Sequence, residues 1–108
     1  MRMAVWDERD RALTRLGELR GQFADRLRTR LERLAEQVAT AHRNPTSGTL
    51  AEAIATAHRL AGTAGSFGYV AVGESAAGLE RSLQRIAGGQ DDWEAALAAL
   101  ERAQASGP

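Results

Sequence analysis

The protein has 108 residues, with fourteen basic and fourteen acidic side chains, no net charge and no cysteine. This length favours one domain, residues 1–108, and the balanced charge argues against a nucleic-acid-binding protein. The absence of Cys excludes disulfides, thiolate metal sites and thiol nucleophiles. Because every basic residue is Arg, the P-loop lysine, Schiff-base chemistry and a lysine general base are excluded as well.

Targeting and membrane segments are not evident in the sequence. No stretch approaches the apolar length of a membrane span, and residues 1–10 lack the apolar core of a signal peptide. We therefore expect a cytoplasmic protein that enters no membrane.

The first half of the chain shows helical periodicity. Leu13, Leu16 and Leu19 predict a short helix, placed at residues 6–17. Apolar side chains then recur every three or four residues and predict a second helix over residues 22–42. They are Phe23, Leu27, Leu31, Leu34 and Val38. Gly17 and Gly21 lie between the two patterns and predict a kink or turn there.

The clearest break in the chain is the Asn-Pro-Thr-Ser-Gly run at residues 44–48. Thr49 is expected to cap the next helix, residues 49–66, with Glu52 in the capping-box position. The predicted buried side of this helix comprises Leu50, Ile54, Ala57, Ala61 and Ala64.

Two further helices are predicted in the second half. The first covers residues 70–87, is followed by Gly88 and Gly89, and buries an apolar stripe. That stripe comprises Val72, Ala76, Leu79, Leu83 and Ile86. The second covers residues 91–104 and is capped by Asp91 or Asp92. Its expected core residues are Trp93, Ala96, Leu97 and Leu100.

Amphipathic helices joined by short connections pack as antiparallel neighbours. The expected fold is therefore all-α: an antiparallel up-down four-helix bundle with an extra N-terminal helical segment. A monomer is the expected oligomeric state.

The chain contains two histidines. His42 lies near the end of a predicted helix, where a cation interacts favourably with the helix dipole. His58 lies in mid-helix on the flank of the apolar stripe, with Gly62 and Gly65 on the same side. Two interpretations stay open from these residues alone. Either the glycines allow close helix packing and His58 is an ordinary flank residue, or a bare surface gives another protein access to the imidazole.

The run from Ala57 to Gly68 resembles the signature of histidine-containing phosphotransfer (HPt) domains. In that family the phospho-accepting His is followed by Leu two residues later, by Gly after four, then by small residues, a bulky apolar residue and a second Gly. The corresponding positions after His58 are Leu60, Gly62, Thr63, Ala64, Phe67 and Gly68. The resemblance covers nearly the whole chain, because similar helices precede and follow the run.

The resemblance implies a phosphoryl carrier in a two-component phosphorelay, with His58 as the phospho-acceptor and no independent enzymatic turnover. The implied partners are receiver domains of response regulators or hybrid histidine kinases, whose aspartate exchanges phosphate with His58. Leu60, Phe67 and Gly68 are expected to be structural. The surface expected to contact the partner comprises Arg59, Ala61, Gly62, Gly65 and Ser66.

Neutral imidazole is a good nucleophile near pH 7, since its unperturbed pKa is about 6.5. We expect attack through Nε2. The chain needs no cofactor or metal of its own on this interpretation, and Mg²⁺ is expected on the receiver. Many family members have Lys three residues after the His, where this chain has Ala61. That difference leaves an alternative open: a helical adaptor that docks a receiver or kinase domain without being phosphorylated.

Overall fold

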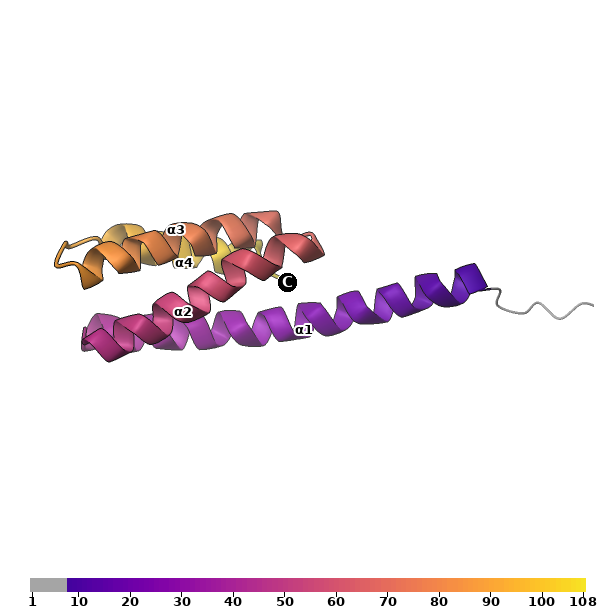
Figure 1. The fold of residues 1–108 in the computed structure, drawn as a ribbon, viewed down its shortest axis with the longest axis horizontal. Helices are drawn as coiled ribbons and strands as arrows, with labels where there is room; N and C mark the ends of the chain where they lie inside the picture. The colour runs from indigo at the N-terminus through magenta and orange to yellow at the C-terminus, as the bar shows by residue number, and fades with distance from the viewer. Residues whose placement is uncertain (1–7) are drawn as a thin grey trace, which may run out of the picture.

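The computed structural model describes residues 8–108, which form four α-helices and one short 3-10 helix (Figure 1). The elements are α1 (Glu8–Arg43), α2 (Ser47–Thr63), η1 (Ala64–Phe67), α3 (Val70–Ala87) and α4 (Trp93–Ser106). The predicted all-α helical bundle is confirmed. The start of the predicted helix at residues 6–17 lies partly outside the described residues.

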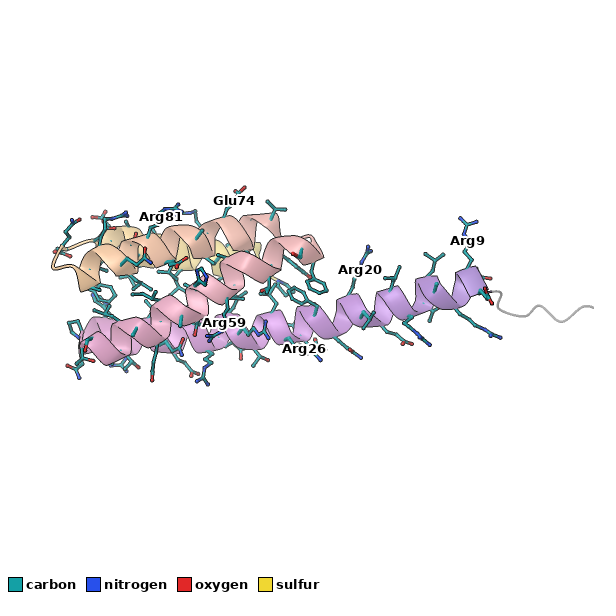
Figure 2. All side chains as sticks on the ribbon, in the orientation of Figure 1. Arg9, Arg20, Arg26, Arg59, Glu74 and Arg81 are labelled. Atoms are coloured by element: carbon teal, nitrogen blue, oxygen red, sulfur yellow. The ribbon has the colours of Figure 1, made fainter. Side chains whose placement is uncertain are left out.

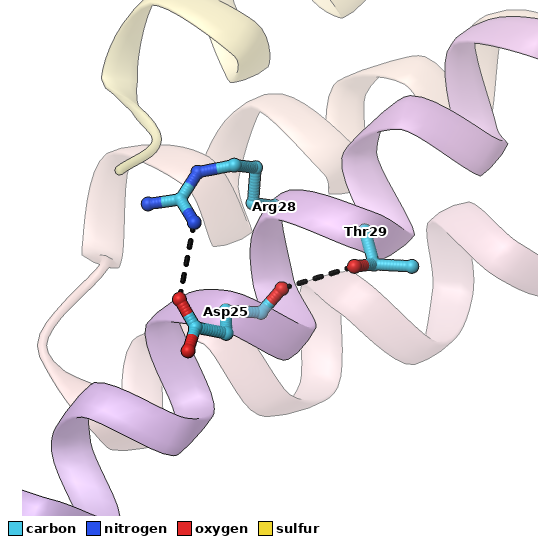
Figure 3. Close-up of polar contacts among 3 residues, drawn as sticks. All are labelled: Asp25, Arg28 and Thr29. Carbon is cyan, nitrogen blue, oxygen red and sulfur yellow. Dashed lines mark hydrogen bonds and ion pairs between the residues drawn. The ribbon is translucent and has the colours of Figure 1, made fainter.

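The helix α1 is continuous over 36 residues, so the predicted kink or turn at Gly17 and Gly21 was wrong. A glycine inside a helix costs only about 1 kcal/mol relative to Ala. Strong helix formers surround both glycines, and neither glycine has a positive φ. Contacts within α1 add to the helix. Arg28 Nη1 lies 3.1 Å from Asp25 Oδ1, and the Thr29 hydroxyl donates to the Asp25 carbonyl (Figure 3).

The core lies along one face of each helix. The predicted stripe from Phe23 to Val38 in α1 and the predicted stripe of α3 are buried throughout, whereas Leu13, Leu16 and Leu19 at the start of α1 are exposed. Leu50 and Ala57 in α2 and Ala64 in η1 are buried as expected, whereas Ile54 and Ala61 lie half-buried at the edge of the core. In α4, Leu97 is 37% exposed, so its assignment to the core was wrong. Ala99 and Ala103 point inward instead, because the buried stripe of α4 runs through small residues.

Figure 1 shows successive helices running in opposite directions, with α3 beside α2 and α4. The N-terminal part of α1 extends past the end of the other helices. We call residues 8–20 the overhang. None of the helices within residues 8–108 combines the length and apolar character needed to cross a membrane.

The N-cap of α2 lies three residues earlier than predicted. Thr46, not Thr49, is the N-cap: its hydroxyl accepts from the Thr49 N–H, and the Thr49 hydroxyl accepts from the Thr46 N–H at 2.9 Å. Thr49 thus takes the N3 role that the sequence analysis gave to Glu52. α2 therefore begins two residues before the predicted start at residue 49, and it ends at Thr63 rather than at residue 66 because Ala64–Phe67 form η1.

An ion pair joins α3 to the start of α4. Asp92 occupies the N-cap position of α4, but its carboxylate makes no capping hydrogen bond. It binds Arg85 instead, with Oδ2 at 2.9 Å from Nε and 2.7 Å from Nη2. Hydrogen bonds from Arg85 and then from Ser82 lower the pKa of Asp92 below its ordinary value of 3.8.

This lowered pKa predicts an acid-dependent loss of stability. The folded state favours the Asp92 carboxylate, so its contribution is complete above the unfolded-state pKa of about 3.9 and disappears as the pH falls through the lower folded-state value. The melting temperature of the wild type should therefore fall more steeply below about pH 4 than that of Asp92→Asn. Melting temperatures that decline in parallel for the two proteins would contradict the role of this pair.

Candidate functional site

His58 lies in the middle of α2 and its side chain is 74% exposed. The neighbouring Ala57 and Leu60 are fully buried and anchor this part of α2 in the core. The helical turn therefore holds the imidazole at a defined place on the surface while solvent and other molecules reach it. His58 is more exposed than the flank position that the sequence predicted.

One ring nitrogen of His58 has a partner from another helix. Nδ1 lies 2.9 Å from Oε2 of Glu80 in α3. Glu80 is only 18% exposed, so the bundle holds this carboxylate in place. A carboxylate only accepts hydrogen bonds, and Nδ1 must therefore carry the proton. Nε2 is left with its lone pair and with no hydrogen-bonding partner among residues 8–108.

The surface beside His58 is bare. Ala61, half-buried, and Gly62, exposed, lie one turn further along α2, and Gly65 follows in η1. A Cβ built on Gly62 or Gly65 would have no contact within 4 Å. Close helix packing therefore explains neither glycine, and the surface on this side of the imidazole is open.

The glycine that does allow close packing is Gly73 in α3. A Cβ there would lie 3.5 Å from the Ala61 carbonyl oxygen and 3.5 Å from the Gly65 nitrogen. Gly73 brings α3 against the end of α2, on the same α3 that carries Glu80. Neither Gly73 nor Glu80 was predicted from the sequence, since neither belongs to the run around His58.

The bundle supplies no cation to His58. Arg59 is exposed, but its Nη2 donates to Thr56 Oγ1 at 3.3 Å, on a different side of α2. The residue three positions after His58 is Ala61, which carries no charge. Among the described residues, the charged group that contacts the imidazole is the carboxylate of Glu80.

The turn after α2 explains two of the motif positions. Gly68 ends η1 with φ of 92°, a left-handed conformation that side-chain-bearing residues avoid. Phe67 is 48% exposed and stacks on Phe23 of α1, with ring centroids 3.8 Å apart. Ser66, which lies between Gly65 and Phe67 in the sequence, is exposed.

Replacing Gly68 with Ala should destabilise the protein. The left-handed conformation costs a residue with a Cβ about 1 kcal/mol or more, which corresponds to a fall of roughly 4–8 °C in melting temperature for a domain of this size. Gly65→Ala is the matched control, because Gly65 lacks a positive φ and has open space around it. Equal melting temperatures for the two variants would show that the turn tolerates a Cβ at residue 68.

The other histidine lies elsewhere. His42 is in the last turn of α1, and its ring lies 4.6 Å from the ring of Trp93 at the start of α4. Within residues 8–108 no group of three or more His, Asp or Glu side chains could hold a metal ion.

A comparison with protein families is decisive at this point. The family model described as Hpt domain matches residues 18–106, nearly the whole chain. The chain belongs to the Hpt domain family. Hpt domains are helical phosphocarrier modules of histidine phosphotransfer in phosphorelays, and they interact with receiver domains of two-component systems. Searches of curated proteins and of solved structures found no match to this Hpt domain.

Proposed function

We propose that His58 of this Hpt domain accepts a phosphoryl group at Nε2 from a receiver-domain aspartate, and returns it to a receiver-domain aspartate. The observation that carries the proposal is the hydrogen bond between Nδ1 and Glu80. It orients an exposed imidazole and leaves the Nε2 lone pair free to attack.

The transfer of the phosphoryl group needs no reacting group on this chain besides the imidazole. The Nε2 lone pair forms a bond to phosphorus, the bond from phosphorus to the aspartyl oxygen breaks, and that oxygen keeps the electron pair. Since Nδ1 keeps its proton, the phosphorylated ring carries a positive charge. The Glu80 carboxylate, 2.9 Å from Nδ1, stabilises that charge as it develops. The reverse sequence returns the phosphoryl group.

The remaining chemistry falls to the partner. Phosphoryl transfer depends on positioning and on neutralising charge on the phosphoryl oxygens. With Ala61 beside His58 and Arg59 held on Thr56, residues 8–108 place no cation against the imidazole. A Mg²⁺ ion bound by the receiver would neutralise them. The division of labour makes this domain a nucleophile carrier that needs no ATP site.

The docking surface of the receiver should include the bare surface at Ala61, Gly62 and Gly65. Gly62→Leu should slow phosphoryl transfer severely, because a large side chain would project from this surface beside the imidazole. Gly62→Ala is the control: it meets no neighbour and gains about 1 kcal/mol of helix stability. Rates of transfer from a charged receiver measure both. Unchanged transfer in Gly62→Leu would remove this surface from the proposal.

The experiment that tests the function is intact-mass measurement. The protein is mixed with Mg²⁺ and each of several receiver domains charged with acetyl phosphate. A gain of one phosphoryl group that is labile to acid and stable to alkali is the expected result. Binding to a receiver without any mass gain would favour the adaptor instead, for which the absence of a cation near His58 is the supporting observation.

A further inference from the structure

The overhang of α1 presents an apolar stripe that no other part of the described chain covers. Leu13, Leu16 and Leu19 are 57%, 48% and 50% exposed. Figure 1 shows this part of α1 beyond the bundle, and Arg9 and Arg20 are labelled on it in Figure 2. The Hpt match begins at residue 18, so most of the overhang lies outside the family domain and its phosphocarrier role does not account for the stripe.

The stripe continues the core-facing side of α1. Leu16 and Leu19 are followed at helical spacing by Phe23 and Leu27, which are buried by the bundle. At the junction, Leu16, Leu19 and Arg20 line a groove of about 550 Å³ with Ser66, Phe67 and Gly68. Phe67 and the nearby Val70 are themselves 48% and 56% exposed. The other helices of the bundle end beside this groove. The apolar face of α1 that they cover continues beyond them into the overhang.

We propose that a second copy of this chain covers this face, so that two overhangs pack antiparallel in a two-fold symmetric dimer. The three leucines are spaced symmetrically about Leu16. An antiparallel pair therefore places Leu16 of one copy against Leu16 of the other, and Leu13 against Leu19. Such self-complementary contacts are typical of two-fold dimers.

The shape of the chain selects the antiparallel arrangement. The bundle lies on the same face of α1 as the stripe, so two overhangs that met in parallel would bring both bundles into the same space. In the antiparallel arrangement the bundles lie at opposite ends. The overhang has thirteen residues and is about 20 Å long at 1.5 Å per residue. The tip of each overhang then reaches Phe67 at the end of the other bundle.

The area is adequate for a stable contact. Each copy offers five large apolar side chains that are about half exposed: Leu13, Leu16, Leu19, Phe67 and Val70. Covering roughly 100 Å² on each would bury about 1,000 Å² in the pair, close to the lower limit for a specific interface. A dimer would also stabilise the overhang helix, which Gly17 and Gly21 weaken. A monomer was expected from the sequence, in which these leucines were assigned to an extra N-terminal helical segment.

The dimer covers the groove at Ser66, Phe67 and Gly68 and leaves His58 itself uncovered. His58 lies eight residues before Ser66 at the edge of the groove, about 12 Å along the helix. Both copies would therefore present His58 to receivers. The test below does not depend on phosphorylation, so its result can contradict the dimer without contradicting the carrier function.

Light scattering coupled to size-exclusion chromatography of the full chain gives the first test. The wild type at about 100 µM should have twice the mass of one chain, since this concentration populates dimers of even modest affinity. Leu16→Glu should have the mass of one chain with unchanged helicity. Leu97→Glu on α4, a similarly exposed leucine outside the stripe, should remain a dimer. A wild-type protein with the mass of one chain, or equal dissociation in both variants, would overturn the proposal.

Cysteine cross-linking gives the orientation, because the natural chain has no Cys. Under mild oxidation, two copies of the Leu16→Cys variant should form a disulfide with each other. Leu13→Cys should not cross-link alone, but should do so when mixed with Leu19→Cys. Efficient self-cross-linking of Leu13→Cys would mean a parallel pair and would overturn the antiparallel dimer.

Discussion

His58→Gln should abolish the phosphoryl gain in the intact-mass experiment while leaving the protein folded. Glutamine keeps the polarity and approximate size of the side chain but has no nucleophilic nitrogen lone pair, since its amide nitrogen is delocalised. The His58 side chain is 74% exposed, so helicity and melting temperature should stay close to those of the wild type.

His42→Gln is the matched control, because His42 is the other histidine of the chain. Its ring contacts Trp93 and lies in the last turn of α1, on a different helix from His58. This variant should be phosphorylated at the wild-type rate. Labelling that survives in His58→Gln, or that is lost in His42→Gln with the fold intact, would assign the acceptor to a different residue.

The helices were predictable because their apolar stripes recur with the helical period. Each predicted stripe residue of α3 is buried, and its predicted range coincides with Val70–Ala87. The errors occurred where local signals compete. Gly17 and Gly21 are unfavourable in a helix, but by too little to end one flanked by strong helix formers. Both Thr46 and Thr49 have capping chemistry, and the choice between them depends on the backbone at Pro45–Thr46, where Thr46 is extended.

Half of the candidate site was predictable from local sequence. His58, Gly62 and Gly65 form one run on one helix face, and their arrangement follows from helix geometry alone. Glu80 was not predictable in this way, because it lies 22 residues from His58 and on another helix. Its contact depends on how closely α3 approaches α2, which Gly73 allows through packing against Ala61 and Gly65. Tertiary contacts of this kind leave no periodic signal in a single sequence.

Glu80→Ala should slow phosphoryl transfer about tenfold without preventing it. The variant removes the acceptor that keeps the proton on Nδ1, so the ring rotates more freely and spends part of its time in the tautomer with a protonated Nε2. It also removes the charge that stabilises the phosphorylated ring. A charge-assisted hydrogen bond of this kind is worth about 1.5–3 kcal/mol, and the exposure of His58 reduces that through solvent screening. The expected loss is therefore smaller than that from His58→Gln.

Glu80→Gln separates orientation from charge. The amide oxygen can still accept from Nδ1, so the tautomer and the ring position are kept while the negative charge is lost. Its transfer rate should fall between those of the wild type and Glu80→Ala. Rapid-quench measurement of transfer at several receiver concentrations provides a further distinction, since loss of ring orientation lowers the maximal rate and leaves the concentration for half-saturation unchanged. A higher receiver concentration for half-saturation with an unchanged maximal rate would show that Glu80 contacts the receiver. A wild-type rate in Glu80→Ala would show that Glu80 does not position His58.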